Sequence, residues 1–420
     1  MLHPRIVPVV RPLASALVAL ALVVGSAAFA QTTVDYFSFM TTSDQIDILE
    51  DLIAVFEAEN PGIEIEYTTA DYGSYFTKLQ TDFAAGDPPD VFELNYENFV
   101  TFASRDTMLP IDDYIAASDN ISTATFYPAA LDAFAYEGTQ YGLPISFSTV
   151  VLFYNQDLFD AAGVSYPTDD WTWEDVIEAG KAITNPSQRV WGISQPVQFW
   201  EFYKVAVQAG GGVMVSPEVQ IDTPENRAAA HYLADKVQVH GIMPTDADLA
   251  GMGDTDLFMN GQLGMIVTGI WMIQSFLDNA AFPWDIAVEP GSVQKGSHFF
   301  SNTAAVAKGS DVPEAAYKWV EFLAAHPAVA SARIEHNWEL SALSLDQAEA
   351  LEPFLAQPAP ANREAVFRAL ESAVTPPVVE KQSELQDIVN EELDAARLGT
   401  KTVEQALADA QRRVEAMMAQ

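Results

Sequence analysis

The sequence predicts an α/β protein with largely parallel β-sheets, and its length favours two lobes. Short apolar strand segments and amphipathic helical segments alternate along most of the chain, which is typical of parallel sheets covered by helices. The chain has 420 residues, of which 49% are hydrophobic and none is cysteine. It is therefore long enough for more than one core, and its stability depends on those cores rather than on disulfides.

The first half of the chain gives the alternation most clearly. Strands are predicted at 33–39, 63–67 and 90–94, and an amphipathic helix at 44–60 ends at the pair Pro61 and Gly62. A second helix carries Tyr75, Leu79 and Phe83 on one face before the break at 86–89. In such a fold the ligand crevice lies at the carboxyl ends of the strands.

The pattern restarts at 141–145 and continues into the almost wholly apolar strand 150–154. Further segments are predicted as helices at 173–182, 200–208, 224–240 and 313–325, and as a strand at 284–288 that precedes a glycine- and serine-rich loop, 289–301. The C-terminal third is predicted to be helical. The uncharged stretch 257–277 contains polar residues and three glycines, so we interpret it as a helix end, a turn, a buried strand at 265–267 and a new helix, not as a membrane span.

The first thirty residues have the layout of a secretory signal peptide. Arg5 and Arg11 precede the apolar run 13–24, and the small-residue stretch 25–30 ends in an Ala-x-Ala site. The run is shorter than the roughly 20 residues that a transmembrane helix needs. We expect cleavage after Ala30 and export of a soluble protein, and the lack of cysteine excludes a lipid anchor at a new N-terminus.

Composition excludes several classes of function. There are 59 acidic and 20 basic residues, for a formal net charge of −39, which disfavours nucleic acid and anionic membranes as partners. Without cysteine there is no thiolate nucleophile or thiolate metal site. The common hydrolase, zinc-protease and phosphate-loop motifs are absent, and the histidines have no ligand spacing. We therefore expect no catalysis, no cofactor and no metal.

Several short motifs occur along the chain, and their order is informative. They are AGDPPDVF at 85–92, GLP at 142–144, LFYNQDLF at 152–159, TWED at 172–175, GGG at 210–212, FMNGQLGM at 258–265, GIW at 269–271 and LGTKTVEQAL at 398–407. In this order the chain resembles, over nearly all of 33–415, the carbohydrate-binding family of extracytoplasmic solute-binding proteins that serve ABC importers.

The resemblance implies the two-lobed type II periplasmic-binding-protein fold, with a hinge between lobes that are discontinuous in sequence. We expect residues 31–145 plus about 295–345 in the first lobe. Residues 146–294 plus about 346–420 are expected in the second. Chain crossings near 146–148 and within 290–301 suit that fold.

The resemblance also places aromatic residues at the ligand. A neutral sugar offers hydroxyl pairs and flat C–H faces, so its site combines polar side chains with aromatic rings. Trp200 and Trp271 match the two stacking positions of the family, with a role as plain core tryptophans as the alternative.

Polar candidates follow the strand at 90–94. Glu97 can accept from two hydroxyls, Asn98 can donate and accept, and Tyr96 can stack or bond. A solvated loop with a helix cap is the alternative for this segment. No arginine or lysine lies in 95–98, where some relatives carry an acid and base pair.

Six further residues are weaker candidates for the ligand site. Phe39 and Ser43 belong to the loop after the first strand, where core packing is equally expected of Phe39. Ser148 matches a hinge position at which some relatives carry a carboxylate. The remaining three are Tyr72, Asn302 and Trp338, which loop packing could equally explain.

We therefore expect a monomeric, periplasmic protein that captures an oligosaccharide, a disaccharide or a polyol between its lobes and delivers it to membrane permease subunits. A cationic ligand such as a polyamine, held by carboxylates and aromatic rings, is the alternative within the same fold. An exported glycoside hydrolase is the enzymatic rival, but with so many acidic residues a suitable carboxylate pair is uninformative.

Overall fold

The computed structural model describes residues 31–213, 218–343 and 351–419; the predicted signal peptide lies outside them. The strands are β1 Thr32–Ser38, β2 Ile63–Thr69, β3 Val91–Asn95, β4 Ala135–Tyr136, β5 Thr139–Gln140, β6 Gly142–Ser148, β7 Val150–Asn155, β8 Trp191–Ser194, β9 Leu263–Gly269, β10 Trp284–Ala287, β11 Ser297–His298, β12 Phe300–Val306 and β13 Ala373–Val374.

Helices make up most of the remaining structure. They are α1 Ser43–Glu59, α2 Tyr72–Ala85, α3 Tyr96–Ala103, α4 Asp112–Ala117, α5 Pro128–Asp132, α6 Gln156–Ala162, α7 Trp173–Ile183, α8 Phe199–Gln208, α9 Pro224–Gln238, α10 Asp246–Leu249, α11 Asp254–Met259, α12 Ile273–Asn279, α13 Pro313–Ala325, α14 Pro327–Glu335, α15 Leu351–Leu355, α16 Ala365–Leu370, α17 Gln382–Arg397 and α18 Val403–Met418. Short 3₁₀ turns lie at Thr123–Thr125, Pro186–Gln188 and Ile270–Met272.

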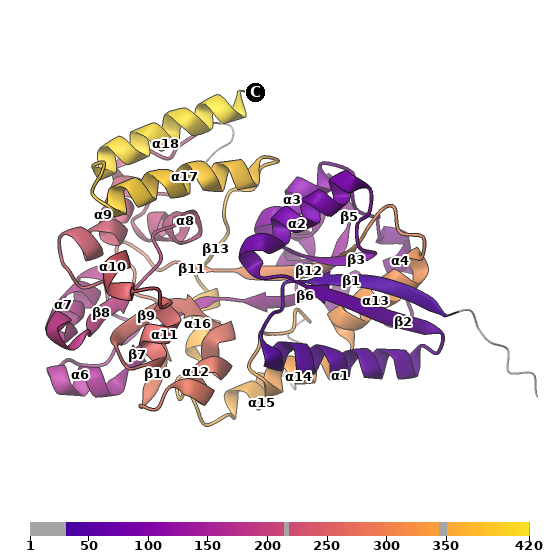
Figure 1. Cartoon of the computed structure of the whole chain (residues 1–420), viewed down its shortest axis with the longest axis horizontal. Coiled ribbons are helices and arrows are strands. Elements are labelled where there is room, and N and C mark those ends of the chain that lie inside the picture. Colours follow the sequence, from indigo (N-terminus) through magenta and orange to yellow (C-terminus); the bar gives the residue numbers. More distant parts are fainter. Residues whose placement is uncertain (1–30, 214–217, 344–350, 420) are drawn as a thin grey trace, which may run out of the picture.

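Two sheets lie side by side, each in its own lobe (Figure 1). One has the strand order β2-β1-β3-β12-β6 and the other β10-β7-β9-β8. In the first sheet only β12 runs against the other strands, and in the second only β7 does. The predicted two-lobed α/β fold is thus confirmed, and each main sheet is mixed, with all strands but one running the same way.

The reversed strands are those that enter a lobe from the hinge. β6 leaves the first sheet at Ser148 and the chain enters the second sheet as β7 at Val150. The chain returns through β11 and enters the first sheet as β12. The two crossings are bonded together, because the Thr149 hydroxyl donates to the His298 carbonyl at 2.6 Å and the Ser297 hydroxyl donates to the Val150 carbonyl at 2.9 Å.

Each sheet buries both faces, as its strand sequences require. In β7, Val151 and Phe153 pack with α11, α12 and α16, whereas Leu152 and Tyr154 pack with α6 and α7 on the other side. The first sheet has α1 and α13 on one face and α2 and α3 on the other. A separate apolar cluster joins α8, α9, α17 and α18.

Local sequence fixes where the helices begin. The side chains of Thr42, Asp71, Asn95 and Asn155 each accept from a backbone N–H in the first turn of the helix that follows. Thr402 and Gln405 form a reciprocal capping box at the start of α18. The predicted helix starts differ from the observed ones by only one residue at α1, which Thr42 caps, and at α8, which has no side-chain cap.

Two glycines allow α7 to pack closely on β8. A Cβ atom on Gly192 would lie 2.3 Å from the Cα of Gly180, which is backbone and has no freedom to move aside. We expect Gly192→Ala to lower the free energy of unfolding by about 1–3 kcal/mol through overpacking. Urea unfolding measures this change, and Gly309→Ala, where a Cβ meets open space, is the matched control. Equal stability of both variants would contradict this packing.

Candidate functional site

Strand ends from both sheets meet at the crossings. β1, β3 and β6 end at one edge of the first sheet, at Ser38, Asn95 and Ser148, and the reversed β12 begins at the same edge with Phe300. In the second sheet β9 ends at Gly269, opposite the start of β7 at Val150. This topology gathers most of the predicted site residues, because they follow or end these strands.

A polar group, the Asn95 cluster, consists of Tyr72, Asn95, Glu97 and Asn98. The Asn95 amide donates to the Tyr72 hydroxyl at 2.7 Å and to Glu97 Oε2 at 2.5 Å. The Asn98 amide donates to Asn95 Oδ1 at 2.8 Å. Asn95 also caps α3, so the helix cap and the polar site are one structure rather than alternatives.

Aromatic rings border the Asn95 cluster. Phe39 lies edge-on to Tyr72 at 5.7 Å and to Tyr75 at 5.3 Å between ring centroids. The Tyr72 ring is 54% exposed, while its hydroxyl points inward to Asn95. Burial of that hydroxyl, with the nearby charge of Glu97, raises the pKa of Tyr72. Tyr72 therefore offers an exposed ring face beside fixed polar groups.

The two predicted tryptophans, both carried by the second lobe, belong to one row of rings, the aromatic row Trp271–Phe300–His298–Trp200, whose two middle members lie on the segment that enters the first sheet. Phe300 lies 5.9 Å from Trp271 and stacks on His298 at 4.8 Å, and His298 lies 5.4 Å from Trp200. The backbone supports this row at Trp271, since a Cβ atom on Gly269 would lie 2.1 Å from the indole. Trp200 and Trp271 are both partly exposed.

Glu97 of the first lobe and Tyr203 of the second lie close enough to interact electrostatically. Tyr203 lies on α8, one helical turn after Trp200, and its ring is 5.4 Å from His298. Burial, and next the charge of Glu97, raises the pKa of Tyr203. Among the described residues, neither Glu97 Oε1 nor the Tyr203 hydroxyl has a hydrogen-bond partner, although both side chains are buried. Such groups are costly unless something bonds to them.

A third group lies where β12 and β6 meet the segment after α14. The Asn302 amide donates to Ser146 Oγ at 3.2 Å and to Glu339 at 3.3 Å. Glu339 also pairs with Arg333 at 3.3 Å, and the Arg333 guanidinium lies 4.4 Å from the Trp338 ring centroid. Burial raises the pKa of Glu339. Asn302 is the register partner of Asn95, so this group adjoins the Asn95 cluster.

The structure places the remaining predicted residues more loosely. Tyr96 begins α3 beside the Asn95 cluster. Ser148 is buried at the end of β6, with its hydroxyl unpartnered among the described residues. Ser43 begins α1, but its side chain lies outside the described residues.

Sequence reasoning missed several residues of these groups, namely Asn95, Ser146, Tyr203, His298, Phe300, Arg333 and Glu339. Tyr203 had a usable signal, because it lies three residues after Trp200 on a predicted helix and so shares its side.

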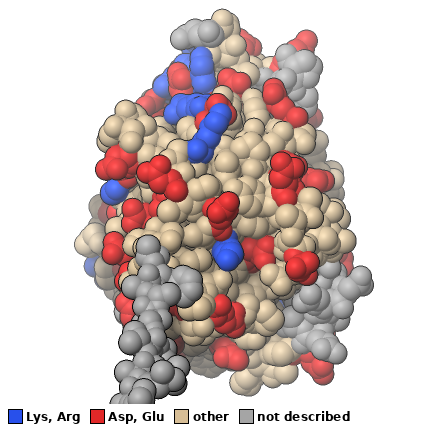
Figure 2. Space-filling view, turned by 90° about the vertical axis from the view of Figure 1, so that its right-hand side faces the viewer, with Lys and Arg blue, Asp and Glu red and all other residues tan. Residues whose placement is uncertain are grey.

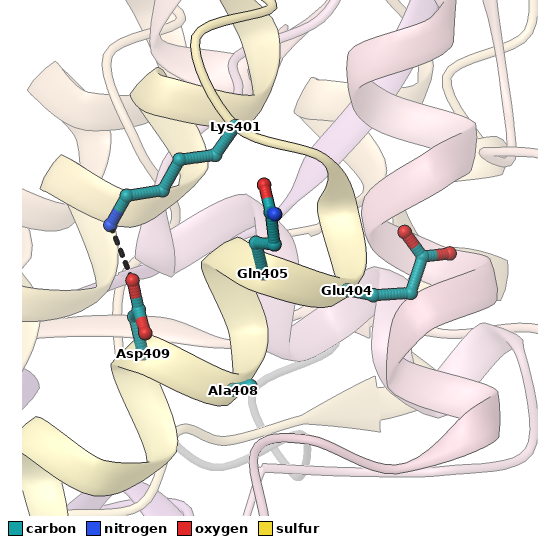
Figure 3. A pocket seen from close by; sticks show the side chains of 5 residues that line it. All are labelled: Lys401, Glu404, Gln405, Ala408 and Asp409. Atoms are coloured by element: carbon teal, nitrogen blue, oxygen red, sulfur yellow. Dashed lines mark hydrogen bonds and ion pairs between the residues drawn. The ribbon is translucent and has the colours of Figure 1, made fainter.

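A surface depression lies away from these groups. It has a volume of about 420 Å³ and is lined by Lys401, Glu404, Gln405, Ala408 and Asp409 on α18 and the preceding turn (Figure 3). Lys401 points to Asp409 at 2.7 Å, and Glu404 bonds to His231 at 3.1 Å. Its charged side chains are thus paired, Lys401 with Asp409 and Glu404 with His231.

Charge and composition of the described part add two findings. Acidic side chains are spread over the face seen in Figure 2 rather than gathered at one place. No group of three or more His, Asp or Glu side chains in residues 31–213, 218–343 and 351–419 could hold a metal ion. Within the same ranges, none of the helices has the length and apolar character to cross a membrane.

A hinged pair of α/β lobes, with the Asn95 cluster on one and Trp200 and Trp271 on the other, defines a two-lobed binding protein. The model of the family "Bacterial extracellular solute-binding protein" matches residues 42–330. The chain therefore belongs to this family of extracellular substrate-binding proteins.

Known relatives support the same assignment. An ABC substrate-binding protein of Listeria monocytogenes, solved in complex with cycloalternan, is 43% identical with a TM-score of 0.89, covering 93% of this chain and 99% of its own. An arabinooligosaccharide-binding protein of Halalkalibacterium halodurans is 26% identical over 57% of this chain and 55% of its own. A maltotriose-binding protein of Pyrococcus abyssi is 24% identical over 68% and 61%.

Glu97 should make stability depend on pH. Burial raises the pKa of Glu97 from 4.5 to about 7, so the folded protein keeps this proton after the unfolded chain has released it. Its contribution to stability is therefore present below pH 4.5 and is lost as pH rises to about 7. We expect Glu97→Gln to gain stability over the parent across this window, by on the order of 2 kcal/mol.

Urea unfolding at pH 4.5 and pH 8 measures this difference. Glu174→Gln, at an exposed position of α7, is the control and should differ from the parent by the same amount at both pH values. If the difference in unfolding free energy between Glu97→Gln and the parent is also the same at both pH values, Glu97 is not desolvated.

Proposed function

We propose that this protein is the exported sugar-binding component of an ABC importer and holds an oligosaccharide, a disaccharide or a related polyol between its two lobes. One observation carries the proposal. The unpartnered oxygens of Glu97 and Tyr203 lie on opposite lobes, next to the aromatic row. A hydroxyl-rich ring can donate to one of these oxygens and accept from the other while its C–H face covers an indole.

Each group has a proposed role. In the first lobe, Glu97 and Asn98 bond hydroxyl pairs, Tyr96 and Tyr72 stack or bond, and Phe39 supports Tyr72. Trp200 and Trp271 stack from the second lobe. Asn302, Ser148 and Trp338 border the ligand from the side of the first sheet, next to the Asn95 cluster. Ser43 stays a proposed contact.

Three considerations favour an oligosaccharide as ligand. The row has two partly exposed indoles, Trp200 and Trp271, with the buried His298 between them, and a single pyranose covers only one indole. The Asn95 cluster continues along the strand edge into the group of Asn302 and Glu339. The relatives named above include proteins described with cycloalternan, maltotriose or arabinooligosaccharide.

The cationic-ligand alternative is weaker on local grounds. Glu93 is bonded by Tyr36 and lies near Arg333, and Glu339 is paired with Arg333. Glu97 remains, and burial raises its pKa to about 7, which lowers the negative charge that it can offer a polyamine. We propose binding without catalysis, and product analysis of the incubated sugars tests it.

Closure follows from contacts to both lobes. A ligand shifts an open and closed equilibrium only by its differential affinity for the two states, so it must reach groups on each lobe at once. We propose a first lobe of residues 31–145 plus about 295–345 and a second of 146–294 plus about 346–420. The strands support this division. Those of the first sheet lie within 32–148 and 300–306, and those of the second lie within 150–287.

The cellular setting is proposed on the family and the N-terminal sequence together. Residues 1–30 serve as a cleaved signal peptide, and the mature protein works as an unanchored monomer in the periplasm. The closed form docks on permease subunits of the inner membrane, and the transporter's ATPase drives import.

Trp200→Ala tests the stacking role. We expect the affinity for cycloalternan or the best sugar of a linear maltooligosaccharide and arabinooligosaccharide panel to fall about 30-fold, as for truncation of a buried tryptophan anchor of about 2 kcal/mol. Isothermal calorimetry measures the dissociation constant. Trp171→Ala, which removes a ring packed on Phe159 in the same lobe, is the control. Unchanged affinity of Trp200→Ala refutes the stacking assignment.

Tyr203→Phe tests the hydroxyl alone. Since this hydroxyl has no partner among the described residues, its removal should leave the stability of the free protein the same or slightly higher. Sugar affinity should fall about 5-fold through loss of one hydrogen bond. Tyr317→Phe is closely matched, because the Tyr317 hydroxyl is also buried and unpartnered among the described residues but lies in the core of the first lobe. Equal sugar affinity in both variants would remove Tyr203 from the site.

A further inference from the structure

One side of α8 follows the segment that leads back to the hinge. Trp200, Lys204 and Gln208 are spaced four residues apart, which places them along one side of the helix. All three bond to residues 289–298, the segment between β10 and β12, which we call the return segment. The contacts span the helix from its start near the hinge to its end.

Each contact joins a different part of the return segment. The Trp200 carbonyl bonds with His298 Nε2, and the Lys204 ammonium donates to Glu289. The Gln208 amide donates to the Gly296 carbonyl at 2.8 Å, while the Gln208 carbonyl accepts from the Val293 N–H at 2.9 Å. The fit is close, because a Cβ atom on Gly296 would lie 3.2 Å from Gln208 Cγ.

The middle contact is a buried ion cluster. Lys204 and Glu201 have no exposed side-chain surface, and Glu289 has 2%. Gln195 donates to both carboxylates, at 2.5 Å to Glu201 and 3.1 Å to Glu289. Burying such charges costs several kcal/mol per ion, and well-packed apolar side chains are often as stable. A core that needed only stability would not require this arrangement, which instead fixes one register of α8 against the return segment.

The return segment continues directly into the hinge. Ser297 and His298 bond with Thr149 and Val150 of the other crossing, and His298 stacks on Phe300 at the start of β12. A rotation at the crossings therefore moves the return segment, and any rigid attachment of α8 makes Trp200 and Tyr203 follow it.

We propose that Lys204 and Gln208 are positioning residues that couple the ligand-facing start of α8 to the hinge. This inference rests on the proposed sugar-binding function. Lys204 and Gln208 do not touch the sugar in this scheme; they keep Trp200 and Tyr203 in place relative to the return segment, so that a ligand stacked on Trp200 acts on the hinge.

Lys204→Met tests the coupling, with Lys236→Met as its matched control. Lys236 is also a fully buried lysine, on α9, and its charge lies near those of Glu201 and Glu289, but it donates to the Tyr232 carbonyl at 2.9 Å rather than to the return segment. The chain has no cysteine, so Asp113→Cys and Asp157→Cys, at exposed positions of α4 and α6, supply spin labels on the two lobes. With cycloalternan as probe, the parent and Lys236→Met should show a shorter interlobe distance and equal affinity.

For Lys204→Met we expect at least tenfold weaker binding and no ligand-dependent shift of the interlobe distance, at temperatures where circular dichroism shows the variant folded. Lys204→Met leaves two buried carboxyls without their cation, so Gln208→Met is the second variant and should behave in the same way if the first does not fold. Binding within twofold of the parent and normal closure in a folded variant would overturn the proposal.

Hydrogen exchange separates this proposal from the proposed function. If the parent binds no sugar of the panel, the function is wrong, and the coupling is then read without ligand. In Gln208→Met the backbone amides of α8 and of 289–298 should lose protection together, whereas in Lys236→Met neither should. Loss of protection in only one of the two segments also overturns the coupling.

Discussion

The whole arrangement depends on the two crossings being bonded to each other. Thr149 and Ser297 hold the crossings side by side through bonds to the His298 and Val150 carbonyls. Because each crossing enters a sheet as a reversed strand, the remaining strands of both sheets can all end toward the hinge. Side chains from distant parts of the sequence then meet at these ends. A binding site between the lobes is thus a consequence of connectivity before any particular side chain is considered.

Both lobes contain buried polar groups near the hinge, but the hydrogen bonding of these groups differs. In the first lobe the Asn95 cluster leaves one carboxylate oxygen of Glu97 unbonded among the described residues, and burial raises the pKa of Glu97. In the second lobe Lys204 lies between Glu201 and Glu289, so its charges are compensated internally. The first lobe therefore offers Glu97 to a ligand, while the second offers the Tyr203 hydroxyl and uses Lys204 to fix the helix that carries the rings.

The sequence predicted the order and kind of the elements because periodicity and caps are local. Trp271 could be placed from its motif, since Gly269 is the residue that lets the indole lie against the backbone. The residues missed are those defined by distant partners. His298 gains its role from Trp200, nearly a hundred positions away, and Tyr203 from Glu97 on the other lobe. Nothing in the local pattern of a loop histidine or a helical tyrosine encodes such a partner.

The aromatic row has a consequence for spectroscopy. Trp200 and Trp271 are partly exposed beside the hinge, whereas Trp191 and Trp319 are buried in the cores of the lobes. An indole's emission depends on the water around it, and Trp200 additionally lies against an imidazole ring, a group able to quench it. Occupation of the space between the lobes should alter the light from these two indoles and leave the core signals constant. The tryptophan fluorescence of the unlabelled protein should therefore report the binding of a ligand between the lobes.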